Sequence, residues 1–200
     1  LYGYRGGIST QDIMLRLKHD VIDLPSSAQY RAVLAIDLKA AFDNLSHDLI
    51  LEQLAATGCG AKVYNYVRNF LRDRSASLVI GDLCSPTEPV SSRGTLQGSV
   101  LSPLLFNLAM RGLPPLLYQI SDVRHAFYAD DITVWVTTGS LGHIETQLQE
   151  AATTIEQYVW RGGLTCCPAK SELLVVTKHA RRQTDLSLNI TLDAKPVPLK

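Results

Sequence analysis

Two adjacent aspartates, Asp130 and Asp131, lie within "FYADDITVWV" (residues 127–136), whose other residues are typical of a buried β-strand. A buried carboxylate is costly unless it is paired or binds a metal ion. Two carboxylates about 4 Å apart repel each other by roughly 4 kcal/mol at an effective dielectric constant near 20, and a divalent cation would reverse that repulsion. By itself, however, such a pair is more typical of a solvated turn.

Asp37 supplies a third carboxylate, at the end of the apolar run in "AIDLKAAFD" (residues 35–43). Because strand residues alternate between faces, Asp130 and Asp131 can serve one site only at a bend, and a hairpin turn at residues 129–131 is predicted. Oxygen ligands suit Mg²⁺, and two such ions about 3.5–4 Å apart can support an in-line phosphoryl displacement. The three acids therefore suggest a two-metal site, although Asp37 alone could equally begin a loop.

The elements that must position these acids follow from hydrophobic periodicity. Helices are predicted at 9–22, 46–58, 62–74, 99–113 and 141–160, and strands at 31–38, 76–81, 171–177 and 186–192 beside the hairpin. The stretch 82–98 is rich in Pro, Ser and Gly and is predicted to be a loop. Strands and helices mix without strict βαβ alternation, which predicts an α+β fold.

Composition sets wider limits. The 200 residues are 46% hydrophobic, which fits one compact domain or a large piece of one. The net charge of zero weakly disfavours nucleic-acid binding, although a local basic patch remains compatible with it. No apolar run is long enough to predict a membrane span. The four cysteines form no CxxC pair, which disfavours a zinc site and favours a reduced intracellular compartment.

Four ordered segments resemble the palm of a reverse transcriptase, in particular that of non-LTR (LINE-like) retrotransposons. They are "AIDLKAAFDNLSHDLIL" (35–51), "RGTLQGSVLSPLLFN" (93–107), "FYADD" (127–131) and "GLTCCPAKSELLVV" (163–176). In addition, "YRGGISTQDIMLRL" (4–17) resembles the stretch that precedes the first of these motifs in such elements. One four-residue match is a weak signal, but four motifs in the family's order are a strong one.

The resemblance implies a right-hand polymerase palm, an antiparallel sheet backed by helices, with part of the fingers. Residues 1–31 would approach the palm, and residues 32–200 would be mainly palm with a fingers-side insertion around 60–95. The thumb and endonuclease are expected to lie outside this sequence, which would end where the primer-grip hairpin should begin. We therefore expect an internal fragment that polymerises poorly or not at all by itself.

The resemblance also implies catalytic roles. Asp37 and Asp130 would bind both metal ions and Asp131 would assist them, so Asp130 is expected to matter more than Asp131. The main-chain carbonyl of Leu38 would complete one metal shell. Lys170 would protonate the leaving pyrophosphate, although a solvated lysine at the start of a strand is the alternative interpretation.

A second group of residues would contact nucleotides. Phe42 would be the steric gate that excludes a 2′-hydroxyl, although it is otherwise typical of a core aromatic residue. Gln97 and Gly98 would pack on the template and the incoming base. Gly94 and Gly98 would allow the backbone to approach nucleic acid closely, and Tyr128 would lie near the primer end.

The reaction implied is RNA-directed DNA polymerisation. A primer 3′-hydroxyl, activated by one Mg²⁺ ion, would attack the α-phosphate of a deoxynucleoside triphosphate, and a second ion would stabilise the pyrophosphate; Mn²⁺ is the alternative metal. The partners would be an RNA template, a DNA primer, deoxynucleoside triphosphates and the rest of the retroelement polyprotein, with no membrane. The location would be intracellular, in either the nucleus or the cytoplasm.

Two other functions stay open at this point. The chain could come from an intron-encoded or telomere-type reverse transcriptase, or from a polymerase that copies RNA into RNA; Phe42 favours deoxynucleotides over the last of these. It could also be a domesticated palm that binds RNA without catalysis. The retention of Asp37, Asp130 and Asp131 argues against such decay.

Overall fold

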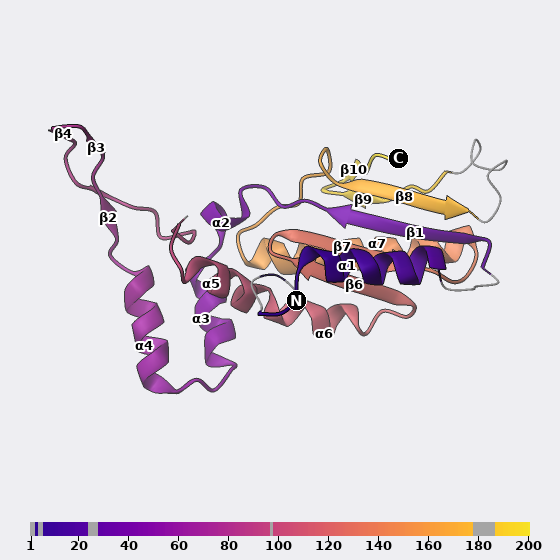
Figure 1. Ribbon diagram of the computed structural model, residues 1–200, viewed down its shortest axis with the longest axis horizontal. Helices are drawn as coiled ribbons and strands as arrows, with labels where there is room; N and C mark the ends of the chain where they lie inside the picture. The colour runs from indigo at the N-terminus through magenta and orange to yellow at the C-terminus, as the bar shows by residue number, and fades with distance from the viewer. Residues whose placement is uncertain (1–2, 4–5, 24–27, 97, 178–186) are drawn as a thin grey trace.

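The computed structural model describes residues 3, 6–23, 28–96, 98–177 and 187–200. Its centre is a four-stranded antiparallel sheet in the order β6-β7-β1-β8 (Figure 1). The strands are β1 (Tyr30–Ile36), β6 (Val123–Tyr128), β7 (Asp131–Val136) and β8 (Glu172–Thr177). The expected α+β fold, with an antiparallel sheet backed by helices, is confirmed.

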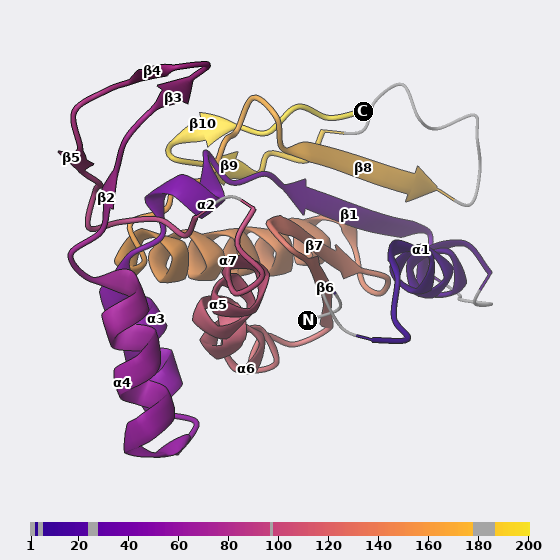
Figure 2. The ribbon, with the colours of Figure 1, turned by 60° about the vertical axis from the view of Figure 1, so that its left-hand side comes forward.

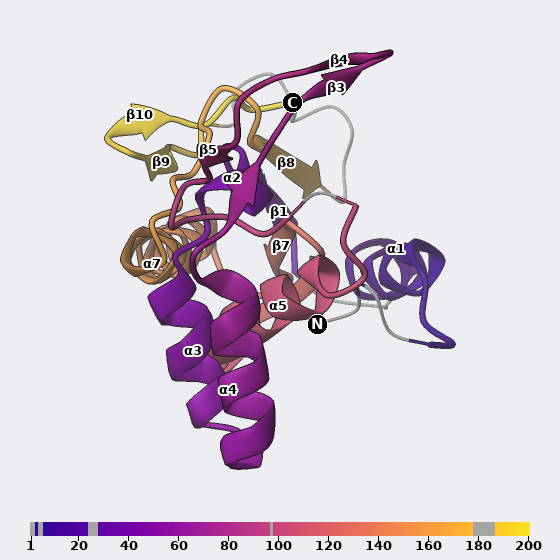
Figure 3. The same cartoon turned by 90° about the vertical axis from the view of Figure 1, so that its left-hand side faces the viewer.

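Helices cover both faces of this sheet, and Figure 3 shows α1 and α7 on opposite sides of the strands. One face carries α5 (Ser102–Ala109), the 3₁₀ turn η2 (Met110–Gly112), α6 (Leu113–Leu117) and α7 (Leu141–Arg161). The other face carries α1 (Thr10–Lys18), which runs into the π-helical turn η1 (His19–Asp23). Among the described residues, no helix combines the length and apolar character needed to cross a membrane.

Coverage of both faces explains the composition of β1. Its residues Ala32, Leu34 and Ile36 point into the main core beneath α7, and Val33 points into a second cluster beneath α1. The sequence of a strand buried on both faces is a continuous apolar run rather than an alternation of apolar and polar residues. The strand ends at Ile36 instead of residue 38, so Asp37 follows directly after its last paired residue.

A helical pair and a β-ribbon extend from one end of the sheet (Figures 1 and 2). The pair consists of α3 (His47–Ala55) and α4 (Gly60–Leu71), and the short helix α2 (Ala41–Asn44) precedes it. The ribbon pairs β2 (Ser75–Ala76) with β5 (Glu88–Pro89), and β3 (Val79–Ile80) with β4 (Leu83–Cys84). The prediction of a loop over 82–98 was therefore wrong in part, because β4 and β5 return along the strand predicted at 76–81.

Other boundaries differ from the predictions for local reasons. The helix predicted at 9–22 changes at His19 to a π turn in which Asp20 and Val21 are buried. The helix predicted at 99–113 begins at Ser102 and continues as α6, because Pro114 occupies the first turn of a new helix, where proline is tolerated.

Of the strand predicted at 186–192, residue 186 lies outside the described residues, and regular pairing is confined to β9 (Thr191–Leu192) and β10 (Lys195–Pro196). Asp193 and Ala194 form the turn between them with φ values of 51° and 55°. Left-handed conformations at both central residues characterise the tight hairpin turn that fits the twist of two strands.

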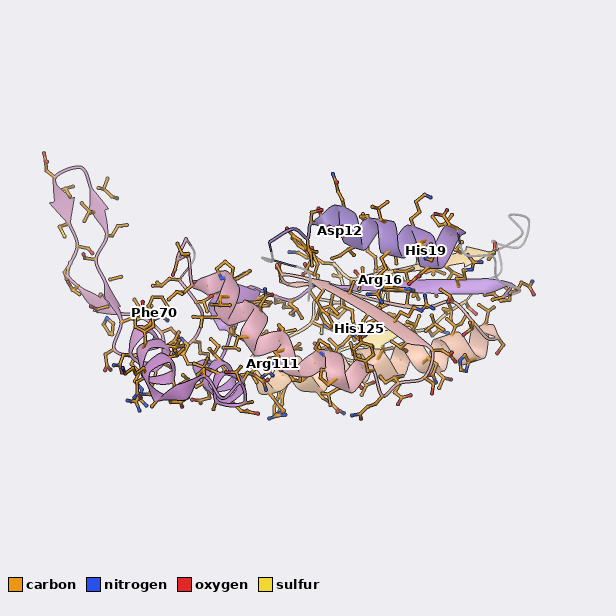
Figure 4. The ribbon with its side chains drawn as sticks, turned by 60° about the horizontal axis from the view of Figure 1, so that its bottom comes forward. Asp12, Arg16, His19, Phe70, Arg111 and His125 are labelled. Carbon is orange, nitrogen blue, oxygen red and sulfur yellow. The ribbon has the colours of Figure 1, made fainter. Side chains whose placement is uncertain are left out.

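His125 on β6 is a buried histidine, 7% exposed, whose ring meets Tyr118 edge-on at 4.7 Å and Phe127 at 5.3 Å between centroids (Figure 4). Its Nδ1 has no hydrogen-bond partner within the described part of the chain. Burial, reinforced by positive charge that includes Arg16, lowers the pKa of His125 from 6.5 to about 4. The folded chain therefore keeps this imidazole neutral.

This histidine predicts a loss of stability in acid. Between pH 6.5 and about 4 the unfolded chain binds a proton that the folded chain does not, so the stabilisation is complete above pH 6.5 and is lost as the pH falls toward 4. We expect the free energy of unfolding to fall by about 3 kcal/mol across this range. Urea titrations of the parent and of His125→Phe at pH 7 and pH 4.5 would measure this fall in the free energy of unfolding. Equal falls in both chains would contradict the prediction.

Candidate active site

The hairpin between β6 and β7 presents the two adjacent aspartates at its tip. Tyr128 pairs with Asp131 as the last register pair, so the turn consists of Ala129 and Asp130. Ala129 has a φ of 54°, which an L-residue with a side chain adopts at a cost of about 1–2 kcal/mol. The predicted bend at 129–131 is confirmed. The turn projects Asp130 from the tip, whereas Asp131 belongs to the strand.

Asp37 reaches the same edge of the sheet. Ile36 pairs with Ile132, so one residue further along the ladder Asp37 lies opposite Asp131. Opposite residues of antiparallel strands carry their side chains on the same face. The backbone around Asp37 is held firmly, because its N–H donates to Ser171 Oγ at 3.2 Å and its carbonyl accepts the Cys167 N–H at 2.8 Å.

A pocket of about 270 Å³ opens beside these carboxylates. Asp37, Asp131, Tyr128 and Lys170 all line it. Lys170 reaches this position through a turn in which its N–H donates to the Cys167 carbonyl at 3.0 Å. The fold thus brings four of the predicted site residues to one cavity from strand ends and a turn that are far apart in the sequence.

The electrostatics at the tip reflect crowded negative charge. Partial burial raises the pKa of Asp131, and the neighbouring Asp130 and Asp37 raise it further. Carboxylate oxygens under mutual repulsion fit a hard divalent cation in chemical type. Nevertheless, within the described ranges no three acidic, histidine or cysteine side chains converge into a closed ion-binding cluster. Mg²⁺ commonly binds one or two carboxylates and completes its shell with water and substrate phosphates, so an open donor set fits this ion.

Of the residues predicted to contact nucleotides, Tyr128 lines this pocket, whereas Phe42, Gly94 and Gly98 do not. Phe42 sits in α2 with its ring 4.8 Å from that of Phe106, at a tilt of 31°. Its carbonyl accepts the Thr95 N–H at 2.7 Å. Gly94 has a φ of 78°, and a Cβ there would lie 2.8 Å from the carbonyl carbon of Asp43. The close approach at Gly94 is therefore to the chain's own backbone, and an approach to nucleic acid there stays a prediction.

Three other predicted residues differ in their surroundings. Gly98 has a φ of 88° and open space where a Cβ would stand, whereas Gln97 lies outside the described residues. Leu38 is 4% exposed and forms an isolated β-bridge with Cys166. Its side chain belongs to the core, so only its main chain is available for the predicted metal contact.

Sequence reasoning missed the α1 wall of the pocket, which consists of Thr10, Ile13 and Met14. It also missed Ser171, which holds the backbone of Asp37, and Asp20, which is buried among ion-pair partners. Asp20 carried a detectable signal, because it is an acid next to Val21 on the apolar stripe of a predicted helix.

The comparison with protein families decides the identity. Residues 1–190 match the family model described as reverse transcriptase (RNA-dependent DNA polymerase). The chain belongs to the reverse transcriptase family. Members of this family generally use divalent metal ions, which agrees with the carboxylates at the hairpin tip.

Curated relatives place this reverse transcriptase chain among retrotransposable elements. It is 30% identical over 174 residues to a probable RNA-directed DNA polymerase from transposon BS of Drosophila melanogaster, covering 85% of this chain and 19% of that protein. It is 38% identical over 110 residues to the Pol polyprotein of the type-2 retrotransposable element R2DM of the same species, covering 52% and 10%. These relatives confirm the predicted resemblance to non-LTR retrotransposon enzymes.

Solved structures agree on the fold. The apo telomerase of Candida tropicalis, truncated from its C-terminal domain, matches 92% of this reverse transcriptase chain and 38% of its own chain with a TM-score of 0.66. The sequence identity of 12% limits that likeness to the fold. The chain spans about a fifth or less of the length of the curated relatives named above.

Proposed function

We propose that this chain is the palm, with part of the fingers, of an RNA-directed DNA polymerase encoded by a non-LTR retrotransposable element. The observation that carries the proposal is the meeting of Asp37, Asp131 and Lys170 at one pocket beside a hairpin tip that presents Asp130. Residues 1–31 approach the palm, residues 32–200 are mainly palm, and α4 with the β-ribbon corresponds to the fingers-side insertion around 60–95.

In this proposal the partners are an RNA template, a DNA primer, deoxynucleoside triphosphates and the remainder of the polyprotein, and the protein works inside the cell, in the nucleus or the cytoplasm. Asp37, Asp130, Asp131 and the Leu38 carbonyl would hold two Mg²⁺ ions, with Mn²⁺ as the alternative. Bound there, the ions would favour ionisation of the primer hydroxyl and offset charge on the triphosphate.

The protein groups have separate tasks. Lys170 lies at the same pocket as the carboxylates, where its ammonium group can donate a proton to the departing pyrophosphate oxygen. Tyr128 lies beside the primer end. Gln97 and Gly98 pack on the template and the incoming base, and Gly98 leaves open space for them.

Primer extension tests the function directly. The chain is placed within a full-length retroelement protein, because the relatives are about five times longer. We expect Mg²⁺-dependent addition of deoxynucleotides to a DNA primer on an RNA template, lost on chelation with EDTA and restored by added Mg²⁺. If the full-length protein binds primed RNA but never extends it, a non-catalytic palm becomes the better explanation.

The steric gate makes a separate prediction. Both the side chain and the main chain of Phe42 are fixed in position. Its ring packs on Phe106, and its carbonyl accepts a hydrogen bond from the Thr95 N–H. We expect Phe42→Ala to raise kcat/KM for ribonucleotides relative to deoxynucleotides by about 10- to 100-fold, because removing the ring opens room for a 2′-hydroxyl. Phe42→Tyr keeps the ring and serves as the control. Unchanged discrimination in Phe42→Ala would place the gate elsewhere.

A further inference from the structure

One wall of the carboxylate pocket is made by α1, to which no role in catalysis has been assigned above. Thr10, Ile13 and Met14 line the cavity together with Asp37 and Asp131. Met14 is 65% exposed, so the core does not explain its position. Methionine is flexible and polarizable, and it is used at surfaces that receive other molecules. The helix therefore presents an adaptable apolar side chain at the catalytic cavity.

A buried carboxylate at the other end of this helical segment fixes it to the hairpin. Asp20 is 5% exposed; its Oδ1 accepts from Arg124 Nη1 at 2.7 Å and its Oδ2 accepts from Trp135 Nε1 at 3.2 Å. Arg124 and Trp135 are directly opposite each other on β6 and β7. Asp20 thus joins α1 to both strands that lead to Asp130 and Asp131.

Further contacts strengthen this attachment. The Arg16 guanidinium lies 5.6 Å from the centre of the Trp135 ring, between α1 and the strands (Figure 4). Ile13 and Leu17 pack against the cluster that contains Val21 and Trp135. Several independent contacts therefore hold one face of α1 on the sheet, while Met14 remains exposed.

The dimensions of the two elements match. The ten-residue step from Thr10, which lines the pocket, to Asp20, which contacts Trp135, spans about 15 Å at helical rise, and the four strand steps from Trp135 to Asp131 span about 13 Å. With Asp20 at the far end of the hairpin and Met14 at the pocket, the helix runs along the hairpin from its base toward its tip. A shift of the helix at Asp20 is therefore transmitted to the pocket wall.

We propose that α1 is the binding wall for the 3′-terminal nucleotide of the primer, with Met14 as the contacting residue and Asp20 as the positioning residue. The proposal rests on the polymerase function proposed above. A pocket of about 270 Å³ is near the lower end of ligand-pocket volumes and suits one nucleotide unit, not a duplex.

The lining of the pocket indicates what it receives. The carboxylates and Lys170 suit the polar hydroxyl and phosphate of a nucleotide, and Met14 offers an apolar surface to its sugar and base. Tyr128 lines this pocket whereas Phe42, the residue assigned to the incoming nucleotide, does not. Lys170, assigned to the departing pyrophosphate, lines the pocket as well, so the assignment of the pocket to the primer terminus rests on the presence of Tyr128 and the absence of Phe42 from its lining.

Kinetics in the full-length protein separate these two occupants. We expect Met14→Ala to raise KM for primed template about fivefold and to leave KM for the deoxynucleotide unchanged. Leu15→Ala is the matched control, because Leu15 is a neighbour on the same helix with the same 65% exposure but does not line the pocket. We expect both KM values of Leu15→Ala to equal those of the parent.

A second variant tests the positioning residue. We expect Asp20→Asn, which removes the charge that Arg124 binds, to raise KM for primed template about tenfold with KM for the deoxynucleotide unchanged. A merely structural role would instead lower the concentration of active enzyme, measured by active-site titration, without moving either KM.

The outcomes distinguish this inference from the function on which it rests. If Met14→Ala behaves like Leu15→Ala, or raises KM for the deoxynucleotide instead, the proposal that α1 binds the primer terminus is wrong. Such a result leaves the polymerase function intact as long as Asp130→Ala still abolishes extension. If Asp130→Ala retains activity, the proposed function itself fails.

Discussion

Asp130→Asn, introduced into the full-length protein, is expected to lower kcat for primer extension by at least about 10³-fold, equivalent to about 4 kcal/mol of transition-state stabilisation. Asn preserves the size of the side chain but removes the negative charge that a divalent cation requires. Asp130 is half-buried in a two-residue turn and belongs to no regular strand, so folding should survive the change. Single-turnover extension of a primed RNA template measures the effect.

The matched control is Asp122→Asn. Asp122 precedes β6 at the end opposite the catalytic turn, has a positive φ of 60° and is paired with the half-buried His143. An unchanged kcat is expected there, because this carboxylate is remote from the pocket. Full activity in Asp130→Asn would rule out the proposed metal-binding role of that residue.

Asp131 provides an internal comparison for the same experiment. It lies opposite Asp37 and lines the pocket, and the resemblance predicts that it matters less than Asp130. Because the pKa of Asp131 is raised, parent activity should decline in acid as the pH falls through that raised pKa. We expect Asp131→Asn to lack this part of the pH profile and to retain more kcat than Asp130→Asn.

Gly94→Ala is expected to lower the free energy of unfolding by about 3–5 kcal/mol. Its φ of 78° disfavours any side chain, and the added Cβ would lie 2.8 Å from the Asp43 carbonyl carbon, with the carbonyl oxygen closer still. Hydrogen bonds to both of its backbone polar groups hold the glycine in place, since its N–H donates to the Leu45 carbonyl at 2.7 Å and its carbonyl lies 2.8 Å from Nε2 of the His47 side chain. Urea unfolding at neutral pH measures the loss.

Gly98→Ala separates the effect of the backbone conformation from the effect of the steric clash at position 94. Gly98 shares a positive φ, 88°, but has open space around the added Cβ. We expect it to cost only about 1–2 kcal/mol. Equal losses at Gly94 and Gly98 would show that backbone conformation alone, and not the contact with Asp43, requires glycine at position 94.

The predictions that succeeded rest on local patterns. The hairpin bend and the helices α3 and α7 could all be predicted, because each depends on neighbours within a few residues. The prediction of a loop at the ribbon was wrong in part because it also relied on local patterns. Leu83 is 77% exposed, so its apolar character does not mark a core strand, and the returning strand β5 contains Pro89, which is typical of a loop.

By itself, the sequence determined the α+β class, the order of the motifs and the identity of the three carboxylates. Those properties depend on residue type, periodicity and spacing along the chain. Only the tertiary structure decided that Asp37 lies opposite Asp131, because that relation depends on the register between strands about 90 residues apart. It also decided that α1 lines the pocket and that Asp20 attaches this helical segment to β6 and β7. A helix's apolar stripe shows that the helix packs, whereas the surface on which it packs is set by the shapes and charges of distant strands.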